Sequence, residues 1–416
     1  MRYAKLSRRQ ALALPAGLGL GSLALSACGG SGNSRDLVVW TFFAEVEQMA
    51  EQYRKKTGRK VVVKVFPGDD YETKMRLALQ TGQNAPDIFD LERSYLGKYI
   101  DAPFTEDLSA MGADKLVRQQ IPYVAALGKD PDGKVRAVTD NSSPGGFWYR
   151  RDLAEKYLGT GDPDGVSGKV RGWDQIIDLG KQVAKESGGK VHLLASYTDV
   201  IMVNQYWMKP WVQDNRLQID PEWNDILDTA RKIRAEGVDA KLDAFSPAWG
   251  AAWNNASVVM FAWPSWAEMQ IDKKKTSGLW GIAKSPRGYY SGGTYRAIYK
   301  GSKKKQRAYD FIEYLSGPEW QTWNLENTQN MPALKTLFHS EAPTYRPPLL
   351  DKQPVLDTYY PIAMQIPARA ADKYSESVLT LFNSAVADMI RQGDSDDDAF
   401  ENLKSQVKDT CPELEV

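Results

Sequence analysis

Aromatic side chains lie beside acids and amides at several places in the sequence, and this combination suits the binding of a sugar. The faces of a sugar ring carry C–H groups that pack flat on Trp and Tyr, while the hydroxyl groups around the ring need polar partners. The chain is rich in aromatic residues, with 13 Trp, 20 Tyr and 12 Phe. The candidate binding residues are Trp40 and Phe42 with Glu45; Glu92 with Tyr95; Trp249, Trp253, Trp263 and Trp266 with Asn254; and Arg369 with Tyr374.

Packing is the alternative role for these aromatic residues, since tryptophan is usually a partly buried core residue. For Trp40 and Trp253, a core and a binding cleft are equally good interpretations. Trp320 and Trp323 are expected to pack in a core, because they follow a helix that covers a sheet. We expect the pair Trp148–Tyr149 to pack as well, as aromatic residues of strands commonly do.

The residue types that catalysis or metal binding would need are scarce. The only histidines are His192 and His339, there are two cysteines, and no H-E-x-x-H, P-loop or G-x-S-x-G motif occurs. The acidic run 394–398 has the spacing of an EF-hand start, but Ala399 and Ser405 stand where calcium binding needs Gly and Glu. We interpret this run as the N-terminus of a helix, whose dipole favours acids. The sequence therefore predicts no metal, no cofactor and no catalytic residue.

Residues 1–27 have the composition of an export signal. Four basic residues and no acids precede an uncharged stretch, 11–27, that is too short and too Gly-rich for a comfortable membrane span. Leu25-Ser26-Ala27-Cys28 resembles the lipobox of bacterial lipoproteins, in which the cysteine is acylated and becomes the new N-terminus. The resemblance implies a lipid on Cys28 and a flexible tether over residues 28–35. Ser7-Arg8-Arg9 fits a twin-arginine signal loosely, so the export route stays open.

The charge of the chain argues against nucleic acid as a partner. The whole sequence has 53 basic and 53 acidic residues, and removal of the leader leaves an excess of four acids. No second apolar run is long enough to span a bilayer, so membrane contact would come from the lipid alone. With Cys28 acylated, Cys411 would be a lone thiol, and the fold would hold by burial rather than by disulfides.

Strand and helix patterns alternate from the start of the exported part, which predicts an α/β fold with a largely parallel sheet. Strands are expected at 37–40, 61–66 and 86–91, and helices at 46–58, 71–82, 173–186, 221–236, 374–389 and from the acidic run to about Thr410. The Gly- and Asp-rich segment 159–169 is predicted to be a surface loop.

These elements occur in the order seen in a known family. The motifs that carry the resemblance are Val38-Val39-Trp40, Tyr53-Arg54-Lys55-Lys56-Thr57-Gly58, Ala85-Pro86-Asp87-Ile88-Phe89, Trp148-Tyr149-Arg150-Arg151-Asp152-Leu153, the stretch from Val258 to Trp266, Gly292-Gly293-Thr294, the stretch from Ala308 to Leu315, Pro318-Glu319-Trp320-Gln321 and Met331-Pro332. They resemble extracellular solute-binding proteins of ABC importers, in the carbohydrate-binding branch that is maltose-binding-protein-like.

The resemblance implies a two-lobed, periplasmic-binding-protein-like fold with the ligand in a cleft between the lobes. Lobe one is expected at 36–143 with a return at 282–316, and lobe two at 144–281 with 317–416, which includes the C-terminal helices. The turn-rich segments 141–146 and 286–288 suit hinges between them.

The resemblance also assigns roles to single residues. Trp266 matches the Trp after the Pro-containing stretch, Tyr374 a stacking aromatic, and Glu92 the polar position after the third strand. Gly292 and Gly293 match a close backbone approach at the cleft, which glycine permits easily. Because the stretch here reads Trp263-Pro264-Ser265-Trp266, either Trp can face the sugar.

The sequence thus predicts a lipid-anchored, monomeric protein on the extracytoplasmic face of the bacterial cell membrane. It would capture a carbohydrate, an oligosaccharide in our interpretation, and deliver it to an ABC permease without covalent chemistry. Polar residues that would select the sugar are Glu45, Glu92, Asn141, Asn254 and Arg369. The alternatives are a binder of another solute on the same fold, such as a polyamine or a peptide, a surface-anchored glycoside hydrolase, and a structural or adhesive lipoprotein.

Overall fold

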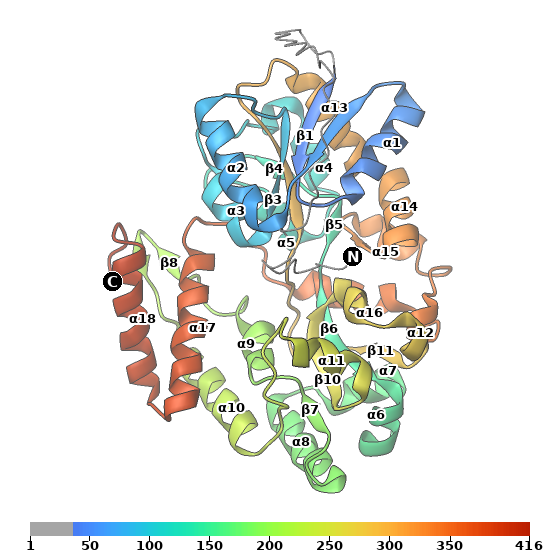
Figure 1. The fold of residues 1–416 in the computed structure, drawn as a ribbon, viewed down its shortest axis with the longest axis vertical. Helices are drawn as coiled ribbons and strands as arrows, with labels where there is room; N and C mark the ends of the chain where they lie inside the picture. The colour runs from blue at the N-terminus through green and yellow to red at the C-terminus, as the bar shows by residue number, and fades with distance from the viewer. Residues whose placement is uncertain (1–35) are drawn as a thin grey trace, which may run out of the picture.

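The computed structural model describes residues 36–416, so the predicted leader, Cys28 and the tether lie outside the described residues. Two β-sheets occupy separate halves of the molecule, and helices surround both (Figure 1). The first sheet has the order β2 (Val61–Val65), β1 (Leu37–Thr41), β3 (Ile88–Glu92), β12 (Thr294–Ile298), β4 (Ala137–Val138). The second has the order β11 (Trp280–Ala283), β6 (Gly145–Arg150), β10 (Val258–Pro264), β7 (His192–Leu194). The predicted α/β class is confirmed.

The first sheet forms where the apolar runs predict strands. Strand β1 pairs in parallel with β2 and β3, while β12 returns antiparallel beside β3. Helices α1 (Glu45–Thr57), α2 (Gly68–Thr81) and α3 (Arg93–Ile100) connect and follow these strands. Gly58 and Gly82 end the first two helices with φ of 71°, the left-handed conformation that glycine adopts at low cost. Both predicted helix ends are therefore confirmed.

The second sheet is mostly antiparallel around β6, with β7 parallel to β10. Helices α8 (Trp173–Ser187) and α10 (Trp223–Ala235) confirm two predictions. The prediction of a loop at 159–169 is wrong, because α7 (Pro163–Lys169) forms there. The Asp162 side chain accepts a hydrogen bond from the backbone N–H of Gly165, Pro163 starts the helix, and Val166 is fully buried.

The C-terminal helices pack against the second half. Phe382 of α17 (Ser375–Gln392) lies 4.9 Å from Trp211 and 4.5 Å from Trp223, measured between ring centroids. Helix α18 (Asp396–Thr410) runs beside α17 (Figure 1). Ser395 and Asp398 form a reciprocal capping box at its start, which confirms that the acidic run opens a helix.

Two predicted lobe boundaries do not coincide with the packing of the elements. Strand β11 belongs to the second sheet although it ends at Ala283, beyond the boundary at 281. Trp320 of α14 (Pro318–Thr328) is 1% exposed and packs in one cluster with the strand residues Leu37 and Val39 of the first sheet, although lobe two was expected to begin at 317. The division into lobes otherwise stays a prediction. The sequence showed the elements but not the sheet on which each one packs.

The remaining elements link the two halves or cover them. A short pair of strands, β5 and β13, lies between the halves, and Gly145 donates its N–H to the carbonyl of Tyr289 over 2.7 Å where two of the three crossing segments meet. The bounds are α4 (Ala113–Val117), α5 (Pro122–Leu127), β5 (Asn141–Ser142), α6 (Arg151–Leu158), α9 (Thr198–Asn204), β8 (Val212–Gln213), β9 (Arg216–Leu217), α11 (Pro247–Asn255), α12 (Lys273–Thr276), α13 (Lys305–Ser316), β13 (Met331–Pro332), α15 (Lys335–Ser340) and α16 (Val355–Gln365), with 3-10 turns at Ser109–Met111, Ser265–Gln270 and Pro348–Leu350.

A buried ionic network fixes the strand ends of the first half. The guanidinium of Arg296 lies 2.5 Å from a carboxylate oxygen of Asp140 and 3.5 Å from one of Asp90. Asp90 also accepts a 2.7 Å hydrogen bond from the Thr41 hydroxyl, and Asp140 accepts a 2.6 Å bond from the indole of Trp320. Burial raises the pKa of Asp90 to about 6, although Arg296 and Thr41 oppose the shift. The network thereby holds β1, β3 and β12 in register next to Trp40.

Candidate ligand-binding site

One cluster of buried hydrophobic residues brings together predicted aromatic residues from both halves. Trp40 of the first half belongs to it with Trp249, Trp253 and Trp263 of the second. The partly buried side chains packed against this cluster include three further predicted site residues, Phe42, Tyr95 and Trp266. The fold therefore joins most of the predicted aromatic residues, although they are distant in sequence.

Trp40 anchors the aromatic side chains of the first half. Its ring lies 4.7 Å from Phe66 between centroids, and Phe42 lies 5.2 Å from Tyr71. The Tyr71 hydroxyl donates to the backbone carbonyl of Trp40 over 3.0 Å, which holds the end of β1 in place. The indole Nε1 of Trp40 is buried and has no hydrogen-bond partner within the described chain. Glu45 lies nearby in sequence, half-buried in the first turn of α1.

Trp249, Trp263 and Trp266 form the corresponding group in the second half, here called the tryptophan row. Ring centroids lie 4.7 Å apart for Trp249 and Trp263, and 5.4 Å apart for Trp263 and Trp266. The indole of Trp266 donates to the carbonyl of Ser291 over 2.9 Å, which ties the row to a crossing segment. Gly292 has φ of 74°, and a Cβ there would lie 3.1 Å from Trp266 Nε1. The close backbone approach expected of glycine is thus made to a tryptophan of the protein itself.

Trp253, by contrast, lies in the core. It is fully buried, stacked on Phe261 at 4.0 Å and 5.2 Å from Trp280. Trp148 and Tyr149 are also buried, as expected for packing residues. Trp253 is one of the two tryptophans for which the sequence left both roles open. It packs against the tryptophan row, since its ring centroid lies 5.5 Å from that of Trp249.

Several predicted polar residues are already used by the protein's own backbone. Glu92 caps α3 and accepts a 2.7 Å hydrogen bond from the N–H of Ser94. Asn254 donates to the carbonyl of Gln270 over 3.1 Å and accepts from the N–H of Asp272 over 2.7 Å. The bond to Glu92 is a local helix cap, a common use of such side chains. The bonds of Asn254 instead join α11 to a segment 16 to 18 residues further along the chain.

The other predicted residues are not members of the shared cluster. Arg369 donates to the carbonyl of Met208, and burial lowers the pKa of its guanidinium. Asn141 lies in β5 opposite Pro332, and Gly293 has φ of 121°. Tyr374 is buried in the core of the second half and also lines an open groove of about 1030 Å³ between α3 and the start of α17. Of the predicted site residues Tyr374 alone lines this groove, which borders the shared cluster because Tyr99, Ile100 and Ala371 belong to both.

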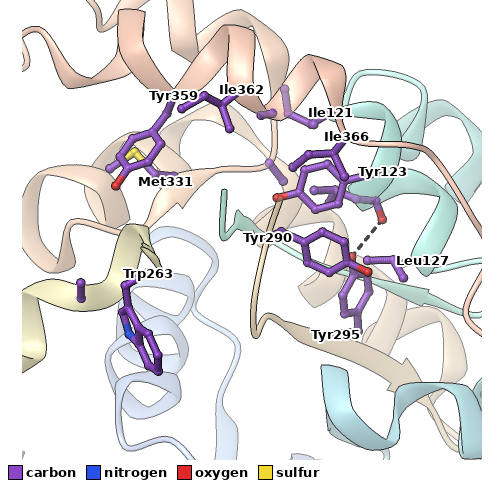
Figure 2. Packing of buried hydrophobic residues seen from close by; sticks show 14 of the residues in the cluster. Ile121, Tyr123, Leu127, Trp263, Tyr290, Tyr295, Met331, Tyr359, Ile362 and Ile366 are labelled. Carbon is purple, nitrogen blue, oxygen red and sulfur yellow. Dashed lines mark hydrogen bonds between the residues drawn. The ribbon is translucent and has the colours of Figure 1, made fainter. Parts of the chain in front are cut away.

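Sequence reasoning missed a polar contact between the halves. Arg93 of α3 forms a 2.6 Å ion pair with Glu376 of α17 and donates to the Tyr290 hydroxyl over 3.0 Å. Tyr290 stacks on Tyr206 at 4.0 Å and on Tyr123 at 4.6 Å, and Figure 2 shows Tyr123 and Tyr290 together with Tyr295. Burial raises the pKa of Glu376, and Arg93 opposes the shift. The one available signal was that Arg93 directly follows Glu92 at the end of the third strand.

Neither a metal centre nor a membrane span is visible in residues 36–416. No group of three or more His, Cys, Asp or Glu residues in this range is placed to hold a metal ion. No helix there is both long enough and apolar enough to cross a bilayer. His192 Nδ1 lies 2.9 Å from the carbonyl of Gly237, a contact within the second half.

Two α/β halves that meet at a shared aromatic cluster have the architecture of a two-domain binding protein. A family model described as bacterial extracellular solute-binding protein matches residues 42–322, which is more than half of the chain. The chain belongs to this family, as the sequence motifs indicated. The family's members are extracellular binding proteins, so the protein acts outside the cytoplasm.

Two sequence relatives and one solved structure show how far the similarity to known proteins extends. The probable ABC transporter-binding protein of Deinococcus radiodurans is 22% identical over 397 residues, which cover 88% of this chain and 90% of the relative. The arabinooligosaccharide-binding protein of Halalkalibacterium halodurans is 23% identical over 206 residues, 45% of this chain and 43% of the relative. The sugar-binding protein MalE from Xanthomonas citri superimposes with a TM-score of 0.72 at 18% identity, covering 90% of this chain and 96% of that chain. The predicted two-lobed fold is confirmed.

Proposed function

We propose that the protein captures a carbohydrate, an oligosaccharide, outside the cytoplasm and delivers it to an ABC import permease. The observation that carries this proposal is the shared cluster, which brings Trp40 and Trp263 together from the two halves. Their indole N–H groups, like those of the core residues Trp253 and Trp280, are buried without a partner in the described residues. A buried donor without a partner costs about 1–3 kcal/mol, and a sugar hydroxyl would remove that cost. A relative named for an arabinooligosaccharide and a structure named as sugar-binding support the same ligand class.

In this proposal the aromatic side chains supply ring faces and other side chains supply polar groups. Stacking faces come from Trp40, Phe42, Trp249, Trp263 and Trp266. Tyr95 packs against the same cluster, and Glu45 is half-buried in the first turn of α1; in the proposal both supply polar groups to ring hydroxyls. The proposal also keeps, as further candidate residues outside the aromatic group, Glu92, Asn141, Asn254, Gly292, Gly293, Arg369 and Tyr374, with Trp253 as a packing residue. No covalent step, metal or cofactor is part of the function.

Closure of the two halves would couple binding to delivery. Three segments cross between the halves, and two of them meet beside β5 and β13, so the segments can act as hinges, as in other two-domain binding proteins. The halves already touch where Arg93 of α3 meets Glu376 of α17. We propose that ligand stabilises this contact and that the permease recognises the closed form of a monomer.

Thermal unfolding against a panel of mono- and oligosaccharides tests the proposed function. One sugar at a hundred times its dissociation constant should stabilise the folded protein by about 2.7 kcal/mol, which raises the melting temperature visibly. Calorimetry should then show binding, and chromatography should show the sugar unchanged after incubation. A flat panel would instead favour a non-sugar solute, and a consumed sugar would favour a hydrolase.

Anchoring by a lipid on Cys28 is part of the proposal. Replacing Cys28 by serine should move the protein from the membrane fraction to the soluble extracytoplasmic fraction, because the acyl chain needs the thiol. Labelling with a palmitate analogue should disappear in parallel. Cys411 is buried and free, so Cys411→Ser is the matched control and should stay anchored and labelled. Membrane retention of the Cys28 variant would remove the lipid anchor from the proposal.

A further inference from the structure

Phe245 is the most exposed of the large hydrophobic side chains in the described chain, at 69%. Its φ is +65°, in the left-handed region that a bulky side chain rarely adopts. Such a conformation costs on the order of 1–3 kcal/mol and persists only where the surrounding structure enforces it. An exposed aromatic ring held in a strained conformation contributes little to folding, so its position calls for another explanation.

The loop that carries Phe245 is fixed on both sides. Leu242 donates its N–H to the carbonyl of Ala195 over 3.0 Å, and Ser246 donates its N–H to the carbonyl of Asp243 over 3.0 Å. The Ser246 side chain then caps α11 by accepting from the N–H of Trp249 over 3.2 Å. The backbone therefore determines where the ring of Phe245 points.

The ring extends the tryptophan row outward. Its centroid lies 5.5 Å from Trp249 and 5.4 Å from Trp263. Trp263 is 5% exposed and Trp249 3%, so the row runs from buried rings to one that water reaches. The buried Nε1 of Trp263, drawn in Figure 2, has no partner in the part of the chain that the structure describes. Since Phe245 is exposed and its ring lies next to Trp263, a ligand ring that contacts Trp263 would leave a neighbouring ring of the same ligand within reach of Phe245.

We propose that Phe245 determines ligand length by stacking on an outer ring of the oligosaccharide, beyond the ring that meets Trp263. The inference rests on the proposed function and deepens it. Apolar stacking on an exposed phenyl ring selects a ring face and not a pattern of hydroxyl groups. Phe245 therefore favours longer chains over shorter ones and discriminates little between sugar types at that outer position.

Calorimetry on Phe245→Gly with two ladders, arabinobiose to arabinopentaose and maltose to maltopentaose, tests the inference. Glycine fits a positive φ, so the variant should melt at the same temperature as the wild type or higher. Its affinity for the shortest ligand that binds should stay unchanged, while affinity for the longer members should fall roughly tenfold, or about 1.4 kcal/mol. Phe245→Tyr keeps the ring and should restore the preference for length.

The outcomes separate this inference from the proposed function. Equal loss of affinity at every length, or no loss at any length, overturns the role of Phe245 and leaves the binding of sugar intact. A wild-type protein that binds no member of either ladder or of the broader panel overturns both together. Leu77→Ala is the matched control, since Leu77 is 60% exposed on α2 and should leave every affinity unchanged.

Discussion

Replacing Arg296 by methionine should lower the free energy of unfolding by about 3–5 kcal/mol at neutral pH, because the change leaves two buried carboxylates without their cation. The side chains of Asp90 and Asp140 are fully buried, and that of Arg296 is 3% exposed. Water cannot take over the lost interaction at such sites. Denaturant titration monitored by tryptophan fluorescence measures the difference. When the variant is heated, the aromatic site should be lost together with the fold.

The difference in the free energy of unfolding between the wild type and Arg296→Met should become smaller as the pH falls. The pKa of Asp90 is already raised to about 6, above its ordinary value of 3.8, so the folded wild type binds the proton more tightly than the unfolded chain. This group therefore contributes less stability as the pH rises from about 4 to about 6. Without Arg296 the pKa of Asp90 rises further, so the pH range over which this group lowers the stability extends to higher pH. Titrations of both proteins at pH 5 and pH 7.5 should show the smaller gap at the lower pH.

Arg54→Met is the control for this experiment. Arg54 pairs with Glu51 within α1, and both side chains are about half exposed, at 53% and 45%. Pairs of this kind contribute little, so the control should unfold as the wild type does. If Arg296→Met matched the control, the network would be dispensable and β1, β3 and β12 would hold their register without it.

The strands and helices of the first half were predictable because their signals are local. Apolar runs mark β1 to β3, and Gly58 and Gly82 end α1 and α2 by a conformation that few other residues adopt readily. The loop prediction at 159–169 failed because glycine and aspartate suggested a turn, while the decisive features were the cap at Asp162 and the buried Val166. Composition alone does not separate a capped short helix from a loop.

The site was predictable in kind but less so in its members. Tryptophans at Trp253 and Trp263 look equivalent in sequence, yet the first faces Phe261 in the core and the second contacts exposed Phe245. Glu92 and Asn254 are polar side chains, but backbone groups of the protein engage both, at Ser94 directly after Glu92 and at Asp272 in a segment 18 residues beyond Asn254. The ion pair of Arg93 and Glu376 joins residues far apart in the chain, so the position of Arg93 directly after Glu92 indicates a place in the site but does not identify the partner.

Gly97 carries the second large expected effect, because it lets the two halves of the molecule touch. A Cβ at Gly97 would lie 1.9 Å from the carbonyl oxygen of Asp372, which is backbone and has no side-chain freedom to move away. One turn earlier on α3, Arg93 forms its ion pair with Glu376. Gly97 and this ion pair therefore belong to one contact surface between α3 and the start of α17. Glycine inside a helix lowers helix stability, but at position 97 a residue without a side chain lets the backbone of α3 approach the backbone of Asp372 closely.

Gly97→Leu should therefore weaken sugar binding at least about a hundredfold while the unliganded protein stays folded. If closure around the ligand requires this contact, a variant whose closed form is populated to about 1% binds with about a hundredth of the affinity. Calorimetry measures the loss, and small-angle scattering should show that the sugar no longer makes the variant more compact. Gly168→Leu in α7, where the nearest atom to an added Cβ is the tip of Arg171 at 3.8 Å, is the matched control. Unchanged affinity in Gly97→Leu would mean that α3 and α17 need not meet for binding. If the melting temperature also dropped strongly while the affinity stayed intact, the contact would be a fixed part of the fold and not a closure surface.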